Sequence, residues 1–172
     1  MNVRWILLIA LALALLIGGG ITLEQQYAAL HRTTPDFDRM QVKPVALIDD
    51  LGQQVSFDMR IADDVAEQEA GFQYIGRAVL EQTLILFAFS SEFQARFHMR
   101  HVVAPLDIAF VKADGSIIDI ETMVPDPTTA GPYQHLYGPD QPFQYAIEAR
   151  EGFFKEHHIS VGKAKLIVGS GR

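Results

Sequence analysis

Cysteine is absent from this sequence of 172 residues. Without a thiol the chain cannot form disulfides, use a cysteine nucleophile, or hold zinc or an iron–sulfur cluster through thiolates. The motifs of phosphate-binding loops, dinucleotide-binding folds, serine hydrolases and zinc peptidases are missing as well. These absences exclude the cofactor and hydrolase classes that a short motif identifies, and we expect no cofactor.

Positive charge is also scarce. The chain has 14 Lys and Arg residues against 21 Asp and Glu, for a formal net charge of −7. An acidic surface repels phosphate backbones, and no basic run is present to offset that repulsion. We therefore expect no nucleic-acid partner. The hydrophobic content of 49% is that of a single folded domain.

One long uncharged segment occupies the N-terminal end. Residues 5–23 contain no charged side chain, and Arg4 precedes them. These 19 residues just reach the length that a helix needs to span a bilayer. The small residues 18–20 would alternatively suit a signal peptidase, so an uncleaved anchor and a cleaved signal peptide both remain open. In either case Arg4 predicts that the rest of the chain is exported, either anchored in the membrane through residues 5–23 or secreted.

The rest of the chain divides into a polar tether, residues 24–40, and a globular domain, residues 41–172. Alternation of apolar and polar residues predicts a hairpin from 45–48 and 55–61, and Asp64 predicts the start of a short helix over 65–70. Five prolines make residues 125–142 a long loop. Further strands are expected at 84–89, 96–101, 106–112, 116–122, 143–147 and 163–168, and a second short helix at 152–158. The fold class is α+β, a compact and mostly antiparallel, small barrel-like sheet with short helices.

Asp114 and Gly115 mark the turn of a hairpin whose register decides which acids are neighbours. A three-residue loop with Gly115 left-handed pairs Phe110 with Ile118, Ile108 with Ile120 and Leu106 with Thr122, which gives a purely apolar face. On the other face this register places Asp107 opposite Glu121. Such a carboxylate pair needs an offsetting charge, for which Arg100 or Arg96, a bound hard cation, or a polar or cationic ligand are the alternatives.

His98 and His101 form the obvious metal candidate. If residues 96–101 are a strand, positions three apart point to opposite faces and the two imidazoles cannot share one ion. We therefore predict no metal site.

Several short segments resemble the DUF192 family, also called UPF0127. They are Arg96 to His101, Pro105-Leu106-Asp107 with Phe110, Asp114-Gly115, Gly71-Phe72, Leu86-Phe87, and Glu148 with Gly152. The similarity covers about residues 45 to 168. It departs from the family pattern at His98, Arg100, His101 and Gln73, where the family usually has Trp, Lys, Asn and Met. The resemblance implies a mostly β domain with small helices, commonly behind a signal or anchor, and supplies no established activity.

Five residues are our candidates for a binding or structural site: Arg100, His101, Asp107, Glu121 and Glu148. The preferred hypothesis is an exported domain that binds a small polar ligand, an envelope component or a partner protein. The alternative is a carboxylate-based hydrolase that uses Asp107 with Glu121 or Glu148 as acid and base, with His101 nearby. The convergence of two carboxylates and an imidazole in one open pocket would favour the hydrolase.

Overall fold

The computed structural model describes residues 21–127, 131–132 and 135–168. Within these residues no helix combines the length and the apolar character needed to cross a membrane. The predicted anchor or signal segment lies, except for its last three residues, outside the described residues.

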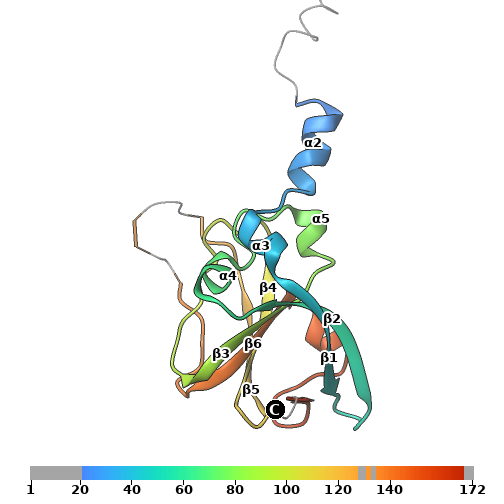
Figure 1. Cartoon of the computed structure of the whole chain (residues 1–172), viewed down its shortest axis with the longest axis vertical. Helices are drawn as coiled ribbons and strands as arrows, with labels where there is room; N and C mark the ends of the chain where they lie inside the picture. The colour runs from blue at the N-terminus through green and yellow to red at the C-terminus, as the bar shows by residue number, and fades with distance from the viewer. Residues whose placement is uncertain (1–20, 128–130, 133–134, 169–172) are drawn as a thin grey trace, which may run out of the picture.

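Seven strands form one open sheet in the order β5-β4-β6-β3-β2-β1-β7 (Figure 1). All neighbours are antiparallel except β2 and β3, which are parallel. The strands are β1 (Gln41–Ile48), β2 (Gln54–Ala62), β3 (Ile85–Phe93), β4 (Leu106–Val111), β5 (Ile117–Met123), β6 (Phe143–Arg150) and β7 (Lys165–Leu166). The mixed α+β class is confirmed.

Five short helices accompany the sheet in the described part of the chain. They are α2 (Leu23–Leu30), α3 (Pro35–Arg39), α4 (Val65–Ala70), α5 (Arg77–Leu80) and α6 (Phe153–Glu156). The predicted helix at 65–70 is confirmed: the Asp64 side chain accepts a hydrogen bond from the backbone N–H of Glu67, and Gly71 ends the helix at a φ of 44°. Helices α4 and α5 lie in the connection between the parallel strands β2 and β3, which cannot be joined by a tight turn.

The core consists of two clusters of buried side chains. The first includes Phe37, Phe72, Phe87, Phe110 and Phe143 and is covered by α3 and α4. The second lies on the other face of the sheet and includes Leu47, Met59, Ile147, Phe154 and Leu166. Strand β4 contributes to both clusters, and all six of its residues are buried.

The first hairpin has the predicted partners, since Val45 pairs with Phe57 and Ile48 with Gln54. The predicted register of the second hairpin is wrong over most of its length. Its loop does place Gly115 in the left-handed region, at a φ of 82°, and Val111 pairs with Ile117 as the three-residue loop requires. Beyond that pair Ile118 is an extra residue in β5, so Phe110 pairs with Asp119 and Ile108 with Glu121.

This hairpin does not need one purely apolar face. Strand β4 is an inner strand, covered by core on both faces, whereas β5 lies at the edge of the sheet. Polar residues of β5 can therefore stand beside apolar residues of β4 and still reach solvent, as Asp119 and Glu121 do. The bulge changes the register without exposing a core side chain.

The barrel-like expectation is also corrected, because the sheet does not close. Its two edges approach only at one end, where Ser116 and Lys165 form an isolated bridge and the backbone N–H of Leu166 donates to the carbonyl of Gly115 at 2.9 Å. A Cβ at Gly115 would lie only 2.0 Å from the backbone carbonyl oxygen of Leu166, so the close approach of these two segments needs glycine.

The predicted tether, residues 24–40, contains most of α2 and all of α3. Helix α2 stands away from the sheet in Figure 1 and has no buried residue. Helix α3, in contrast, buries Phe37 fully, and the following Met40 is 2% exposed. The Arg60 guanidinium lies 4.2 Å from the centre of the Phe37 ring and donates to the Phe37 carbonyl. The packed unit therefore begins before residue 41.

Candidate functional site

A pocket of about 500 Å³ opens between α4, strand β3 and the connection that follows β3. Glu148, on β6, lies at its base, and Gly71 and Phe72 border it at the end of α4. The other walls are mainly aromatic, with Phe87 and Phe89 from β3 and Phe97 from the connection among them. Gln68, Glu69, Gln73, Arg96 and His98 complete the polar part of the lining.

The pleat of β6 aims Glu148 toward this pocket. Glu148 pairs with Ile85 on one side and Ile108 on the other, and both belong to the first core cluster. Side chains that are paired across neighbouring strands share a face. The end of α4 then leaves room for the carboxyl: a Cβ at Gly71 would lie 3.6 Å from Glu148 Oε2. Because φ at Gly71 is 44°, the position also favours glycine by its backbone.

Glu148 is a buried acid of an unusual kind. It is 5% exposed, and its Oε2 atom has no hydrogen-bond partner among the described residues. Burial disfavours the charged form and raises the pKa of Glu148 to about 8. The carboxyl is therefore mainly neutral at pH 7 and offers a proton donor inside an aromatic pocket.

Three other ionisable residues line the pocket: Glu69, Arg96 and His98. The Arg96 guanidinium is 2.8 Å from an oxygen of Asp140. Burial lowers the pKa of His98, so this imidazole is mainly neutral at pH 7. Its Nδ1 accepts a hydrogen bond from the backbone N–H of Arg100. Glu69 is exposed.

Asp107, another of the five predicted site residues, lies on the other face of the sheet from Glu148. The two residues occupy neighbouring positions of the β4–β6 ladder, Asp107 opposite Ala149 and Glu148 opposite Ile108, which sends their side chains to opposite faces. Asp107 is 6% exposed. Its Oδ1 accepts from the Thr122 hydroxyl at 2.7 Å, and its Oδ2 accepts from the backbone N–H of Gly152 at 2.8 Å.

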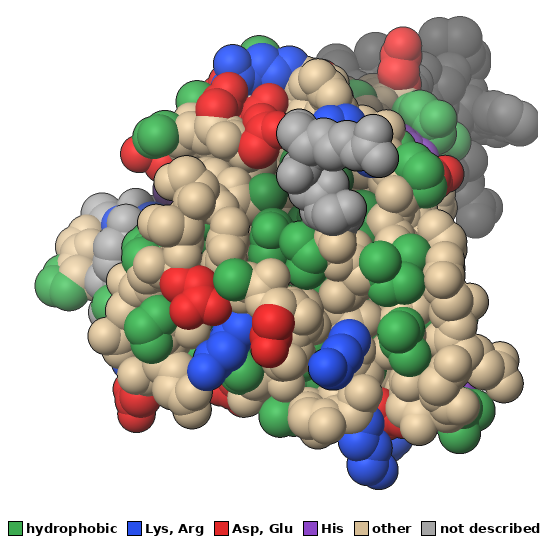
Figure 2. All heavy atoms as spheres, turned by 60° about the horizontal axis from the view of Figure 1, so that its bottom comes forward, with side chains coloured by type: hydrophobic (Ala, Val, Ile, Leu, Met, Phe, Trp, Pro, Cys, Tyr) green, Lys and Arg blue, Asp and Glu red, His purple; other side chains and the backbone are tan. Residues whose placement is uncertain are grey.

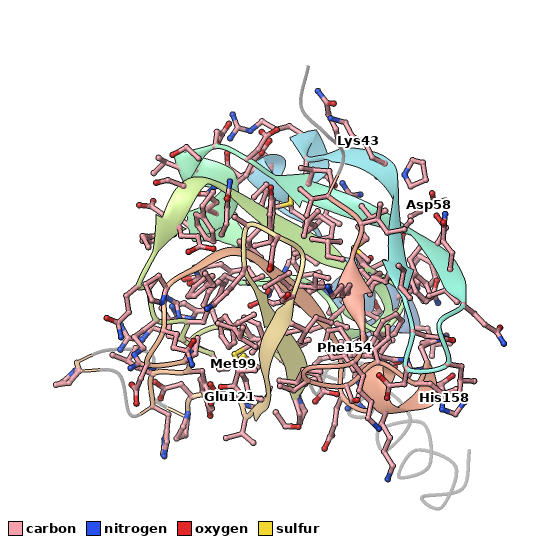
Figure 3. The ribbon with its side chains drawn as sticks, turned by 90° about the horizontal axis from the view of Figure 1, so that it is seen from below. Lys43, Asp58, Met99, Glu121, Phe154 and His158 are labelled. Carbon is pink, nitrogen blue, oxygen red and sulfur yellow. The ribbon has the colours of Figure 1, made fainter. Side chains whose placement is uncertain are left out.

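The predicted pairing of Asp107 with Glu121 is wrong because of the bulge in β5, which places Thr122 opposite Asp107. Glu121 instead accepts a hydrogen bond from the backbone N–H of Gly138, and partial burial raises its pKa. Figure 3 shows Glu121 and Met99 on one side of the β4–β5 hairpin, with Phe154 and His158 on the other. The predicted carboxylate pair does not form.

Arg100 and His101 lie in a segment, residues 96–101, that does not form the predicted strand. In residues 96–101 only Phe97 makes a β-bridge, with Tyr137, so the opposite-face argument for His98 and His101 has lost its basis. His101 takes a φ of 61° and stacks on Tyr74, with 4.3 Å between ring centres. Arg100 donates to the Gly131 carbonyl at 2.7 Å, whereas the hydrogen bonds of Asp107 come from Thr122 and Gly152.

A second, smaller pocket of about 370 Å³ contains Asp107, together with Asp50, Lys155, His158 and Ser160. Its acids are engaged in the fold: both oxygens of Asp107 accept hydrogen bonds, and an oxygen of Asp50 accepts from the backbone N–H of Ser160. The molecular face in Figure 2 intersperses hydrophobic, acidic and basic side chains, with no large area of one charge. The hydrogen bonds from Thr122 and Gly152 give Asp107 a structural role.

No group of three or more His, Asp or Glu side chains is placed to hold a metal ion within the described ranges. The pocket around Glu148 is therefore the strongest candidate site. Of the five sequence-predicted residues it contains only Glu148. Sequence reasoning missed its aromatic walls, although four of the 11 phenylalanines, Phe87, Phe89, Phe93 and Phe97, fall within residues 87–97. This density of phenylalanines is higher than the alternation of one strand requires. It could have indicated an aromatic pocket from the sequence.

The fold and this pocket define a small α+β domain with an open mixed sheet and an aromatic pocket closed by a buried acid. The model of the DUF192 family, described as "Uncharacterized ACR", matches residues 47–166. The chain therefore belongs to the DUF192 family, and the predicted resemblance is confirmed at that level. None of the curated proteins matches the chain significantly.

Two solved structures are similar to this chain. One is a protein from Sinorhizobium meliloti that was named as a candidate transcription regulator, with a TM-score of 0.63 and 25% identity over 74% of this chain and 95% of that one. The other is a protein of unknown function from Novosphingobium aromaticivorans, with a TM-score of 0.62 and 25% identity over 87% of this chain and 100% of that one. Both support the fold, and neither assigns a reaction.

Proposed function

We propose that this domain is a ligand-binding module and that a small polar ligand occupies the pocket around Glu148. The observation that carries the proposal is the Glu148 carboxyl, 5% exposed and with Oε2 lacking a hydrogen-bond partner in the described part of the chain, at the base of an open pocket of about 500 Å³. An unsatisfied buried polar atom costs stability. A ligand that bonds to that oxygen would recover this cost, and the aromatic walls would shield the contact from water.

The hydrolase hypothesis lacks the geometry it needs. Asp107 lies on the opposite face from Glu148, and the Glu121 side chain accepts from the Gly138 backbone. His101 stacks on Tyr74 and does not line the pocket. The predicted acid and base therefore do not converge on a common substrate position, which leaves binding as the better-supported activity.

Filling the pocket tests the proposal. Ala95 lines the pocket and is partly exposed, so Ala95→Trp should place an indole in its mouth without creating a buried cavity. We expect compounds that raise the melting temperature of the full-length protein in a fragment screen to lose that effect in Ala95→Trp. Truncation at residue 41 is unsuitable for this screen because it would remove the buried Phe37.

Ala113→Trp is the matched control, since Ala113 is exposed at the tip of the β4–β5 loop and outside the pocket. It should retain the response to every compound. Compounds that stabilise Ala95→Trp as much as the wild type would place ligand binding elsewhere and contradict the proposal.

We further propose that the domain works outside the cytoplasm, held there by residues 5–23 or released after their cleavage. The uncharged length of this segment and the preceding Arg4 support this location. A periplasmic phosphatase fused after residue 172 should be active in the full chain and inactive when residues 1–23 are deleted. An inactive full-length fusion, with an active cytoplasmic reporter at the same junction, would reverse the assignment.

A further inference from the structure

The charge and the aromatic content of the Glu148 pocket narrow the class of its ligand. Five phenylalanines line it: Phe72, Phe87, Phe89, Phe93 and Phe97. The negative potential over an aromatic ring face attracts cations, and it does so most strongly where water is excluded. Phe72 and Phe87 are almost completely buried, at 1% exposed each, and therefore form the inner part of this wall.

The ionisable groups of the lining do not offer an anion a comparable site. They come from three elements: Glu69 on α4, Arg96 and His98 on the connection after β3, and Glu148 on β6. The Arg96 charge is offset by Asp140 at 2.8 Å, and His98 is mainly neutral at pH 7 because burial lowers its pKa. The net effect is a pocket that can become negative at Glu148 and Glu69 but has no uncompensated positive charge.

We propose that the Glu148 pocket binds a small organic cation, an amine that carries an apolar or aromatic group, with the ammonium at Oε2 of Glu148 and the apolar group against the phenylalanines. This inference rests on the proposed function and specifies the ligand class for that site. A neutral Glu148 carboxyl loses its proton to solvent when the ammonium enters, because a charge that is costly when alone is stabilised by a directly bonded opposite charge. In the resulting ion pair, the Oε2 atom of Glu148 accepts a hydrogen bond from the ammonium and is no longer unsatisfied.

The test compares three probes that share one ring and differ in charge: benzylamine, benzyl alcohol and benzoate. Each is titrated into the full-length protein by calorimetry between pH 6 and pH 8. Because the pKa of Glu148 is about 8, the carboxylate fraction rises about ninefold from pH 6 to pH 7 and about fivefold from pH 7 to pH 8. We expect benzylamine affinity to rise by these factors and its binding at pH 7 to release about one proton, seen as a dependence of the heat on the buffer.

Glu148→Gln supplies the matched variant, since it keeps the shape of the side chain and cannot ionise. It should weaken benzylamine binding at least about tenfold at pH 8 and remove its pH dependence, while benzyl alcohol binding changes little. Tighter binding of benzoate or benzyl alcohol than of benzylamine, or benzylamine binding that does not vary with pH, would overturn the cation inference while leaving a ligand pocket. Failure of all three probes to bind would also overturn the cation inference. The Ala95→Trp fragment screen would still test separately whether the pocket binds any ligand.

Discussion

Glu148→Gln should stabilise the protein at alkaline pH by on the order of 5 kcal/mol. The pKa of Glu148 rises from its ordinary 4.5 to about 8 in the folded state because of burial. Each pKa unit corresponds to about 1.4 kcal/mol of difference between the two protonation states. The unfolded chain therefore ionises this carboxyl, and is stabilised by doing so, over a pH range in which the folded protein keeps it protonated.

The direction of the pH dependence follows from proton binding. Below pH 4.5 both states are protonated at Glu148 and the group has no effect. Between pH 4.5 and 8 the folded state binds more protons, so the free energy of unfolding of the wild type falls as pH rises. Above pH 8 both states are ionised and the loss is complete. Glutamine does not titrate, so the gain from the substitution should appear across this window and level off above it.

Chemical unfolding of the full-length protein at pH 5, 7 and 9 would measure this effect. Glu69→Gln is the control, because Glu69 also lines the pocket but is exposed, and its substitution should change the free energy of unfolding little at any pH. Equal stability of Glu148→Gln and wild type at pH 9 would show that the carboxyl has found water or a partner and ionises normally. The inner pocket would then be more polar than its aromatic walls indicate.

Asp107→Ala should destabilise the protein by about 3 kcal/mol at pH 7. Asp107 is 6% exposed and joins β4 to the Thr122 side chain on β5 and to the backbone N–H of Gly152 before α6. Hydrogen bonds to a charged group are each worth about 1.5–3 kcal/mol, and a part-buried N–H that loses its acceptor keeps its desolvation cost. Alanine removes both acceptors at once.

Two matched variants separate these contributions in urea unfolding. Asp107→Asn should cost only about 1 kcal/mol, because its amide oxygen can accept from the Gly152 N–H while its NH₂ group donates to the Thr122 hydroxyl oxygen. Thr122→Val removes one of the two bonds and should cost about 1.5 kcal/mol, the lower end of the range for a bond to a charged group, because Thr122 is exposed. If Asp107→Ala were no less stable than Thr122→Val, the link to Gly152 would contribute nothing and Asp107 would be an ordinary carboxylate.

Much of the local structure was predictable because it depends on neighbours in the sequence. Alternation at 55–61 predicted β2, Asp64 and Gly71 predicted the ends of α4, and Gly115 predicted a left-handed loop residue. Family membership was also accessible, since short segments such as Pro105 to Asp107 keep their order and spacing. In each case the physical cause, a pleat, a cap or a backbone angle, acts over a few residues.

The site depended on contacts between distant parts of the chain. The register of the second hairpin was mispredicted because β4 is covered by core on both faces, a consequence of its position between β5 and β6. The bulge at Ile118 then separated Glu121 from Asp107. No local pattern contains this information, since an inner and an edge strand of similar length can have similar sequences.

The sequence by itself determined the acidic charge, the absence of thiol chemistry, the family and most of the helices and strands of the domain. Tertiary structure alone decided that Glu148, and neither Asp107 nor Glu121, is the acid at the candidate site. The ends of α4 and β6 are far apart in the chain and meet only in the folded sheet, where Gly71 lies over the Glu148 carboxyl. Burial is a property of that assembly, and it raises the pKa of Glu148. Asp107 is buried to a similar degree, and Glu148 differs from it because its Oε2 atom has no hydrogen-bond partner among the described residues.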